Sequence, residues 1–302
     1  MNPKSSSVDP HGLKDRMENP PLWEAGATDF WRPSWGLERY GVRMHLSPRA
    51  GGVSKAPYDS LNLGLHVGDD PEAVAINRAL LEKRLGAKAI FFDQVHGVQC
   101  LRVDANTPNG LKADGAYTLE RGVACTMMVA DCMPLLLADE KARVVGAVHV
   151  GWRGLVGMGE QGQLLPQGVV EQAHMALTRG VLESTVESGV RLHAWLGPCI
   201  GPNAFEVGPE VLSAFTQRNP LNARFFKPHP HQKNKWLADL PQLVRALLTQ
   251  LGVTHLWGND GSPNWCTVNR ADLYFSHRRD RVSGRFAASI WIDPEENLGV
   301  KL

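Results

Sequence analysis

Two histidines and one cysteine are the side chains of this 302-residue sequence best suited to hold a metal ion. They are His96 in DQVHG, Cys132 in VADCMPLL and His149 in AVHVGWRG. Each lies at the end of an apolar, strand-like run beside Gly, Asp or Pro, where strand ends meet in clefts. Two imidazoles and a thiolate suit zinc, and three protein ligands leave the fourth tetrahedral position for water or substrate. This set predicts a catalytic zinc, which lowers the pKa of bound water to about 7.

The same three residues also have a purely structural interpretation. A histidine at a strand end is usually a hydrogen-bonded polar residue, and a cysteine before an apolar run usually belongs to the core. The separations along the chain, 36 residues from His96 to Cys132 and 17 from Cys132 to His149, are too long for one turn. Only the tertiary fold can bring the three together, so the spacing leaves both interpretations open.

Two basic segments could contact an anion. In GWRG, Gly151 and Gly154 flank Arg153, and freed backbone amides with a guanidinium make an anion cradle. A plain tight turn with Arg153 in solvent is the equal alternative. The segment SHRRDRVSGR contains Arg278, Arg279, Arg281 and Arg285 beside Asp280. There a solvated surface with internal ion pairs is favoured over phosphate binding.

The remaining cysteines and the HPH motif give weaker evidence of a catalytic or metal-binding role. The chain has five cysteines, an odd number, and none forms a CxxC pair, which argues against a disulfide framework or a zinc ribbon. Cys199 lies between two Gly-Pro steps that favour an irregular structural loop, so it ranks below Cys132 as a nucleophile. His229 to His231 resembles the His-X-His pairs of copper oxidases, but its Pro- and Lys-rich surroundings favour an exposed loop.

The elements that must position these residues mix strands and helices throughout the chain. Apolar spacing and end signals predict helices over residues 70–86, 167–179 and 240–251, and strands over 41–46 and 144–150. The first helix has Asp70 and Pro71 at its start and Gly86 at its end, with Val74, Ile76, Leu80, Leu81 and Leu85 as its apolar residues. Regular strand–helix alternation is missing, which favours an α+β or layered α/β sandwich in one domain.

Composition narrows the class of protein. With 43% apolar and 21% charged residues the chain is globular, and a net charge of +1 gives no field to attract nucleic acid. The most apolar stretch, CTMMVADCMPLLLAD, is broken by Asp131 and Pro134 and falls short of the ~20 residues that span a membrane. Residues 1–35 are polar and Pro-rich and lack an export signal, so a cytoplasmic protein is expected. We expect this segment to form an arm that is either mobile or wrapped onto a domain of residues 36–302. Its tryptophans, Trp23, Trp31 and Trp35, favour the wrapped arrangement.

Several long motifs occur in an order that resembles one family. They are SPRAGGVS, APYDSLNLGLHVGDDPEAVAINR, DQVHG, ADGAYT, ADCMPLLLAD, AVHVGWRG, LGPCIGPNAFEVGPEV, FSHRRD and SGR, spread from about Gly41 to Trp291. The sequence resembles the YfiH-like proteins, also called the laccase-domain or polyphenol oxidase family. These proteins are regarded as purine nucleoside phosphorylases with adenosine deaminase activity.

The resemblance implies a fold, a cofactor and reactions. The fold would be a single-domain, layered α/β/β/α sandwich with mixed sheets, and one catalytic Zn²⁺ would be held by His96, Cys132 and His149. The reactions would be phosphorolysis of adenosine, inosine, guanosine and methylthioadenosine, and deamination of adenosine. Arg153 and Arg49 are our candidates for phosphate or ribose contacts. The candidates for hydrogen bonds to the nucleoside are Asn62, Gln94 and Asp131. Besides the zinc ligands Cys132 and His149, catalytic roles are expected for Asp131 and Arg153.

The sequence departs from the family pattern at a few positions and leaves other functions open. Pro48 replaces a threonine, His277 a tyrosine and Val150 an alanine, and residues 160–167 resemble an insertion that could alter substrate preference. The first alternative is a copper-dependent polyphenol oxidase, since a His₂Cys set also accepts Cu²⁺. A non-catalytic, metal-stabilised binding module and a metal-free cysteine hydrolase are the others. The preferred nucleoside and the oligomeric state are not determined by the sequence.

Overall fold

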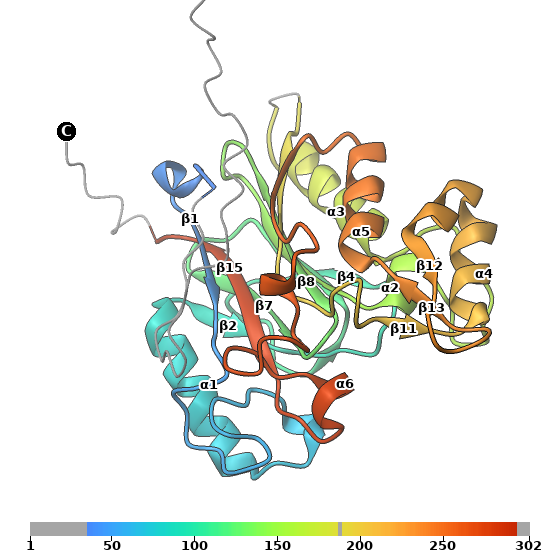
Figure 1. The fold of residues 1–302 in the computed structure, drawn as a ribbon. Coiled ribbons are helices and arrows are strands. Elements are labelled where there is room, and N and C mark those ends of the chain that lie inside the picture. The colour runs from blue at the N-terminus through green and yellow to red at the C-terminus, as the bar shows by residue number, and fades with distance from the viewer. Residues whose placement is uncertain (1–34, 187–188, 295–302) are drawn as a thin grey trace, which may run out of the picture.

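Two stacked β-sheets with helices on both outer faces form the body of the protein (Figure 1). The computed structural model describes residues 35–186 and 189–294. The arm predicted over residues 1–35 therefore lies outside the described residues except for Trp35, which is buried. The domain boundary at residue 36 stays a prediction.

Each main sheet mixes parallel and antiparallel strands. The four-stranded sheet has the order β1 (Val42–Leu46), β15 (Phe286–Ile292), β7 (Val123–Val129) and β2 (Lys88–Ile90). The six-stranded sheet has the order β14 (His255–Gly258), β10 (Leu192–Leu196), β8 (Met133–Asp139), β9 (Val145–Val150), β6 (Gly115–Thr118) and β4 (Cys100–Arg102). Parallel pairs join β2 to β7, β10 to β14 and β4 to β6, and the other neighbours in these two sheets are antiparallel. Two small sheets complete the set. One has the order β11 (Glu206–Val207), β13 (Trp236–Ala238) and β12 (Phe226–Pro228), and the other pairs β3 (Phe92–Asp93) with β5 (Leu111–Lys112).

Alternation along the central strands defines the layers. In β8, Leu136 packs in the core between the sheets, whereas Leu135 and Leu137 face the opposite core under the helices. In β7, Cys125 belongs to the core between the sheets and Ala124 to the one under the first helix. Strands that are buried on both faces have continuous apolar sequences, because every side chain packs in a hydrophobic layer. The predicted layered α/β/β/α sandwich with mixed sheets is confirmed.

The helices lie on the two outer faces and around the rim (Figure 1). They are α1 (Pro71–Leu85), α2 (Trp152–Val156), α3 (Val169–Ser184), α4 (Pro209–Arg218), α5 (Leu240–Gln250) and α6 (His277–Asp280), with 3₁₀ turns η1 (Glu38–Tyr40), η2 (Leu65–Val67), η3 (Pro220–Phe225) and η4 (Pro263–Trp265). The predicted helices correspond to α1, α3 and α5. Among the residues that the structure describes, no helix combines the length and the apolar character that crossing a bilayer needs.

Helix α1 confirms its predicted ends and corrects its predicted face. The Asp70 side chain accepts the Glu72 amide, and Gly86 ends the helix in the left-handed region at φ +66°. Ile76 and Leu80, predicted as part of the apolar face, are 50% and 37% exposed. Asn77 is buried instead, because its amide bonds the loop that precedes the helix.

A stacked histidine pair in the six-stranded sheet, of which His193 is half-buried and His255 exposed, predicts a pH dependence of stability. The His193 and His255 rings stack at 4.2 Å, and burial, with the charge of His255, lowers the pKa of His193 to about 4. An unfolded histidine has a pKa of about 6.5. Between these values the unfolded state binds more protons, so the free energy of unfolding falls as the pH falls from about 6.5 to about 4. His193→Gln should make this decline shallower in urea unfolding curves, whereas His231→Gln, on an exposed loop, should not change it.

Candidate metal centre

An antiparallel strand pair brings Cys132 and His149 together. Cys132 immediately precedes β8, and His149 is the penultimate residue of β9, paired with Pro134. Asp131, in the link from β7 to β8, has φ +93°, a conformation that is costly for a side chain other than glycine. This link crosses from one main sheet to the other, so the turn at Asp131 aims the thiol of Cys132 at the end of β9.

The carboxylate of Asp114, which precedes β6, positions both histidines. Its Oδ1 accepts the His96 amide at 3.0 Å and lies 2.7 Å from Nδ1 of His149. Its Oδ2 accepts the amides of Val95 and Gly97 at 3.2 and 2.6 Å. Asp114 is fully buried, and His96 is held at φ +60°. One carboxylate thus orients the loop of His96 and leaves Nε2 of His149 free to bind a metal.

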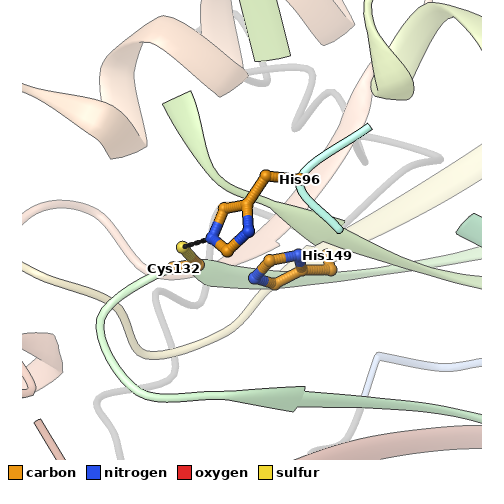
Figure 2. A group of neighbouring side chains, drawn as sticks. All are labelled: His96, Cys132 and His149. Carbon is orange, nitrogen blue, oxygen red and sulfur yellow. Dashed lines mark hydrogen bonds between the residues drawn. The ribbon is translucent and has the colours of Figure 1, made fainter. Parts of the chain in front are cut away.

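The three predicted ligands meet at one point (Figure 2). Their ligand atoms all lie within 4.8 Å of one another, and the Cys132 Sγ to His96 Nε2 distance is 3.7 Å. Zinc bonds of about 2.3 Å to sulfur and 2.1 Å to nitrogen place two tetrahedral ligands roughly 3.6 Å apart. His96 is exposed, Cys132 half-buried and His149 buried, so the exposed side can receive a water or a substrate.

The electrostatics of the triad prepare the thiol for a metal. Burial opposes ionisation, but the charge and hydrogen bond of His149, with the bond to His96, lower the pKa of Cys132 to about 6. Burial likewise opposes charge on His149, yet Cys132 and Asp114 raise its pKa to about 9. Burial also disfavours the Asp114 carboxylate, but its bonds from His149 and two backbone amides lower its pKa. A thiolate, the form that binds metal, is therefore present at neutral pH.

The donor set and the space around it fit one metal ion. A His₂Cys set with an open side is typical of catalytic zinc and also accepts copper. Among the residues that the structure describes, this is the one group of three such side chains close enough to share an ion. Nδ1 of His229, in the HPH motif, instead accepts the backbone amides of His231 and Gln232.

Gly151 lies directly beneath the ligands and gives a prediction about metal affinity. A Cβ at this position would lie 2.7 Å from Cδ2 of His96 and 3.1 Å from Sγ of Cys132. Its φ of −83° is allowed for alanine, so the strain falls on the ligands and not on the backbone. Gly151→Ala should fold normally and bind zinc about tenfold more weakly, an effect of the size seen when ligand orientation is disturbed. A competition titration with a chromophoric chelator measures this, and unchanged affinity would contradict the argument.

The metal centre opens into a cavity of about 560 Å³. Its walls carry apolar side chains such as Met128, Ile200 and Phe205, together with several basic groups. This mixture suits a small ligand with a flat apolar part and a charged or polar part.

Three of the predicted site residues besides the triad line this cavity. The Asp131 carboxylate accepts the Thr267 hydroxyl and the backbone amide of Arg278, both at 2.6 Å. Arg153, on α2, is exposed, with its guanidinium carbon 4.8 Å from the Trp152 ring centroid. Gln94 exchanges two hydrogen bonds with the backbone of Met128, so its amide shapes the wall.

The structure does not place Arg49 and Asn62 on the cavity wall. Arg49 donates to the Asp59 carbonyl and carboxylate. Asn62 is fully buried and bonds the backbone of Gly64 and Arg285. Both hold the loops next to the cavity, and their direct contact with a nucleoside stays a prediction.

Other residues of the site escaped the sequence analysis. Arg278 and Arg285 line the cavity, although the segment that contains them was predicted to be solvated surface. That expectation describes Arg279, which pairs with Asp280 at 2.7 Å. His66 and His277 also line the cavity. The ADG in ADGAYT, which contains Asp114, was a recognisable motif, but nothing local signals that a carboxylate will reach two distant histidines.

Comparison with known proteins places this arrangement in a family. The sequence pattern described as multi-copper polyphenol oxidoreductase laccase matches residues 43–293. A Pseudomonas aeruginosa protein named purine nucleoside phosphorylase is 41% identical over 83% of this chain and 93% of its own. Escherichia coli YfiH, also named purine nucleoside phosphorylase, is 38% identical over 86% of this chain and 97% of its own.

Solved structures agree with the sequence relatives. The crystal structure of a Neisseria meningitidis protein is 36% identical, covers 88% of this chain and 99% of its own, and has a TM-score of 0.76. YlmD from Geobacillus stearothermophilus is 29% identical, covers 84% of this chain and 93% of its own, and has a TM-score of 0.68. The sequence pattern, the relatives and the shared fold together show that this chain belongs to the laccase-like YfiH family.

Proposed function

We propose that this protein is a zinc-dependent purine nucleoside phosphorylase that also deaminates adenosine. The observation that carries the proposal is the His₂Cys cluster of His96, Cys132 and His149, which opens into a cavity lined by arginines. The relatives named purine nucleoside phosphorylase support the phosphorolytic reaction. A net charge of +1 for the whole chain agrees with a small-molecule substrate.

The residues of the chain have separate tasks in this proposal. His96, Cys132 and His149 would hold the zinc, which when bound supplies Lewis acidity and an activated water at neutral pH. Asp114, 2.7 Å from Nδ1 of His149, would accept the proton on that nitrogen and leave Nε2 to hold the zinc. Asp131 is fixed by Thr267 and can accept a proton or a hydrogen bond from the nucleoside.

The two reactions make different demands on the cavity. Deamination needs a nucleophilic water at C6 of the purine, next to the metal side of the cavity. Phosphorolysis needs a phosphate ion held near C1′ of the ribose while the base leaves. Apolar side chains such as Met128 and Phe205 suit the purine, and the basic groups suit the phosphate.

A copper-dependent phenol oxidase is the second candidate, because the matching family carries that description. Four-electron reduction of oxygen needs several copper ions held together. Within the described residues, the one group able to share an ion comprises His96, Cys132 and His149. This favours the nucleoside reactions over the oxidase.

One experiment tests the proposal directly. The protein, purified without added copper, is incubated with adenosine in the presence and absence of phosphate, and metal content is measured in parallel. We expect zinc, adenine with ribose 1-phosphate when phosphate is present, and inosine without it. A chelator should abolish both products and zinc should restore them, which a metal-free cysteine hydrolase does not predict. Copper with phenol oxidation and no nucleoside products would contradict the proposal.

A further inference from the structure

Helix α1 has a second apolar side, which is turned away from the four-stranded sheet (Figure 1). Its inner side is buried through residues such as Leu81 and Leu85, which pack in the core under the helix. The outer side alternates small and large apolar residues and has one charged residue at each end. Its members, all exposed, are Glu72, Ala75, Ile76, Ala79, Leu80 and Lys83. We call this set the outer face of α1.

The spacing of these residues forms one stripe along the helix. At about 100° per residue, the six side chains fall within an arc of about 140°. The members Glu72, Ile76, Ala79 and Lys83 follow one another at intervals of four, three and four residues, which is the spacing of the seam in a coiled coil. A helix face in contact with water usually carries charged and polar residues instead. The outer face therefore has the pattern of a surface that packs against another helix.

The charges of the outer face complement a second copy of the same helix. Glu72 lies in the first turn of α1 and Lys83 in the last. If two copies pack antiparallel about a two-fold axis midway between residues 77 and 78, Glu72 lies opposite the partner's Lys83, and the reverse pair forms by symmetry. A parallel, in-register arrangement would instead place equal charges opposite each other. Charge complementarity thus favours the antiparallel pair.

The sizes of the apolar residues match in the same register. The axis that pairs the charges also places Ile76 opposite the partner's Ala79, and Leu80 opposite the partner's Ala75. Each large side chain then meets a small one, so the ridges of one helix fit the grooves of the other. Ile76 and Leu80 are the two large side chains that such packing would remove from water. One symmetry axis therefore satisfies both the charges and the sizes.

We propose that the outer face of α1 is a homodimer interface, in which the α1 helices of two copies pack antiparallel about a two-fold axis. This inference does not depend on the proposed function, because no residue of α1 lines the cavity at the metal centre. The partner contributes nothing to that site. Assembly and catalysis can therefore be measured separately.

The size of the outer face sets the strength of the dimer. A helix of 15 residues is about 22 Å long and 10–12 Å wide. Such a helix pair alone buries less than the roughly 800 Å² per partner of a standard stable interface. We therefore expect a dimer that dissociates on dilution, with a Kd in the micromolar range.

Sedimentation velocity of the full chain over a range of concentrations tests the interface. Ile76→Glu, which places a carboxylate at the centre of the apolar stripe, should raise the Kd of dimerisation at least about tenfold. Glu72→Lys and Lys83→Glu should each weaken the homodimer about tenfold at low salt, because each reversal turns two attractions into repulsions. An equimolar mixture of these two charge variants should dimerise again, since opposite charges then meet at both ends of the helix pair.

The control for the charge reversals is a glutamate at the same place in another helix. Glu210 follows Pro209 at the start of α4, as Glu72 follows Pro71 at the start of α1, and both glutamates are exposed. Glu210→Lys therefore places the same charge change in the first turn of a helix. This variant should dimerise like the wild type, and circular dichroism should show that every variant is folded.

The outcomes decide between this interface and other uses of the outer face. Dimerisation that the single charge reversals abolish and their mixture restores supports the proposal. A wild type that stays monomeric at concentrations on the order of 100 µM overturns it and leaves the outer face to a different protein or to another segment of this chain. A dimer that neither Ile76→Glu nor Glu72→Lys weakens uses another surface and overturns it too. If the mixture of charge variants stays monomeric, the antiparallel two-fold arrangement is refuted.

Discussion

Cys132→Ala should yield a folded protein that contains almost no metal and turns over purine nucleosides at least about 1,000-fold more slowly. The substitution removes the one thiolate of the triad, and two histidines alone hold zinc poorly. Cys132 is half-buried in a link between strands and packs only against the edge of the core, so the packing of β8 should survive. Metal analysis, circular dichroism and product formation from adenosine and phosphate measure the three expectations.

The control for this experiment is another half-buried cysteine. Cys100→Ala, in β4, should keep its zinc and its activity, because Cys100 belongs to no ligand group. If Cys132→Ala unfolds while Cys100→Ala does not, the metal has a structural role and the binding-module alternative gains support. If the Cys132 variant loses zinc but keeps its turnover, the catalytic role of the metal is refuted.

Asp114→Asn should weaken zinc binding by about 10- to 100-fold and lower the free energy of unfolding by roughly 1–3 kcal/mol. The carboxylate accepts three backbone amides and contacts the His149 ring. Asparagine keeps one acceptor oxygen but points an NH₂ group at donors that then lack a partner. The His96 loop and the His149 ring should both lose orientation. A zinc competition titration and urea unfolding of the metal-free protein measure the two effects separately.

Asp139 provides the matched control for Asp114. It is also fully buried, but it lies at the far end of β8 from the ligands and pairs with Arg143 in the turn that follows that strand. Asp139→Asn should lower stability and leave the zinc dissociation constant unchanged. Equal zinc affinity in both variants would show that Asp114 supports only the fold and not the orientation of the ligands.

Local features allowed part of this protein to be predicted. Helix α1 begins after Asp70 and ends before Gly86 because caps depend on neighbouring residues alone. The ligand types of the triad could be identified because imidazole and thiolate have their metal chemistry wherever they occur. The family pattern over residues 43–293 then confirmed the order of motifs on which the resemblance depended.

The direction in which a side chain points, and whether it is buried, could not be predicted from local features in the same way. Ile76 and Asn77 are neighbours on α1, and only the loop packed against the helix decides that the polar one is buried. Arg278 and Arg279 are also adjacent, yet one lines the cavity and the other pairs with Asp280. Such choices depend on contacts between segments far apart in sequence, and no local pattern encodes them.

The amino-acid sequence by itself determined the kinds of donor that this protein offers, the ends of its main helices and the absence of a strong overall charge. The tertiary structure alone decided that His96, Cys132 and His149 share one point and that Asp114 holds two of them. It also decided that Arg278 and Arg285 line the cavity into which that point opens. The physical reason is that donor chemistry belongs to each residue, whereas distance and desolvation arise only when separate strands and loops pack together.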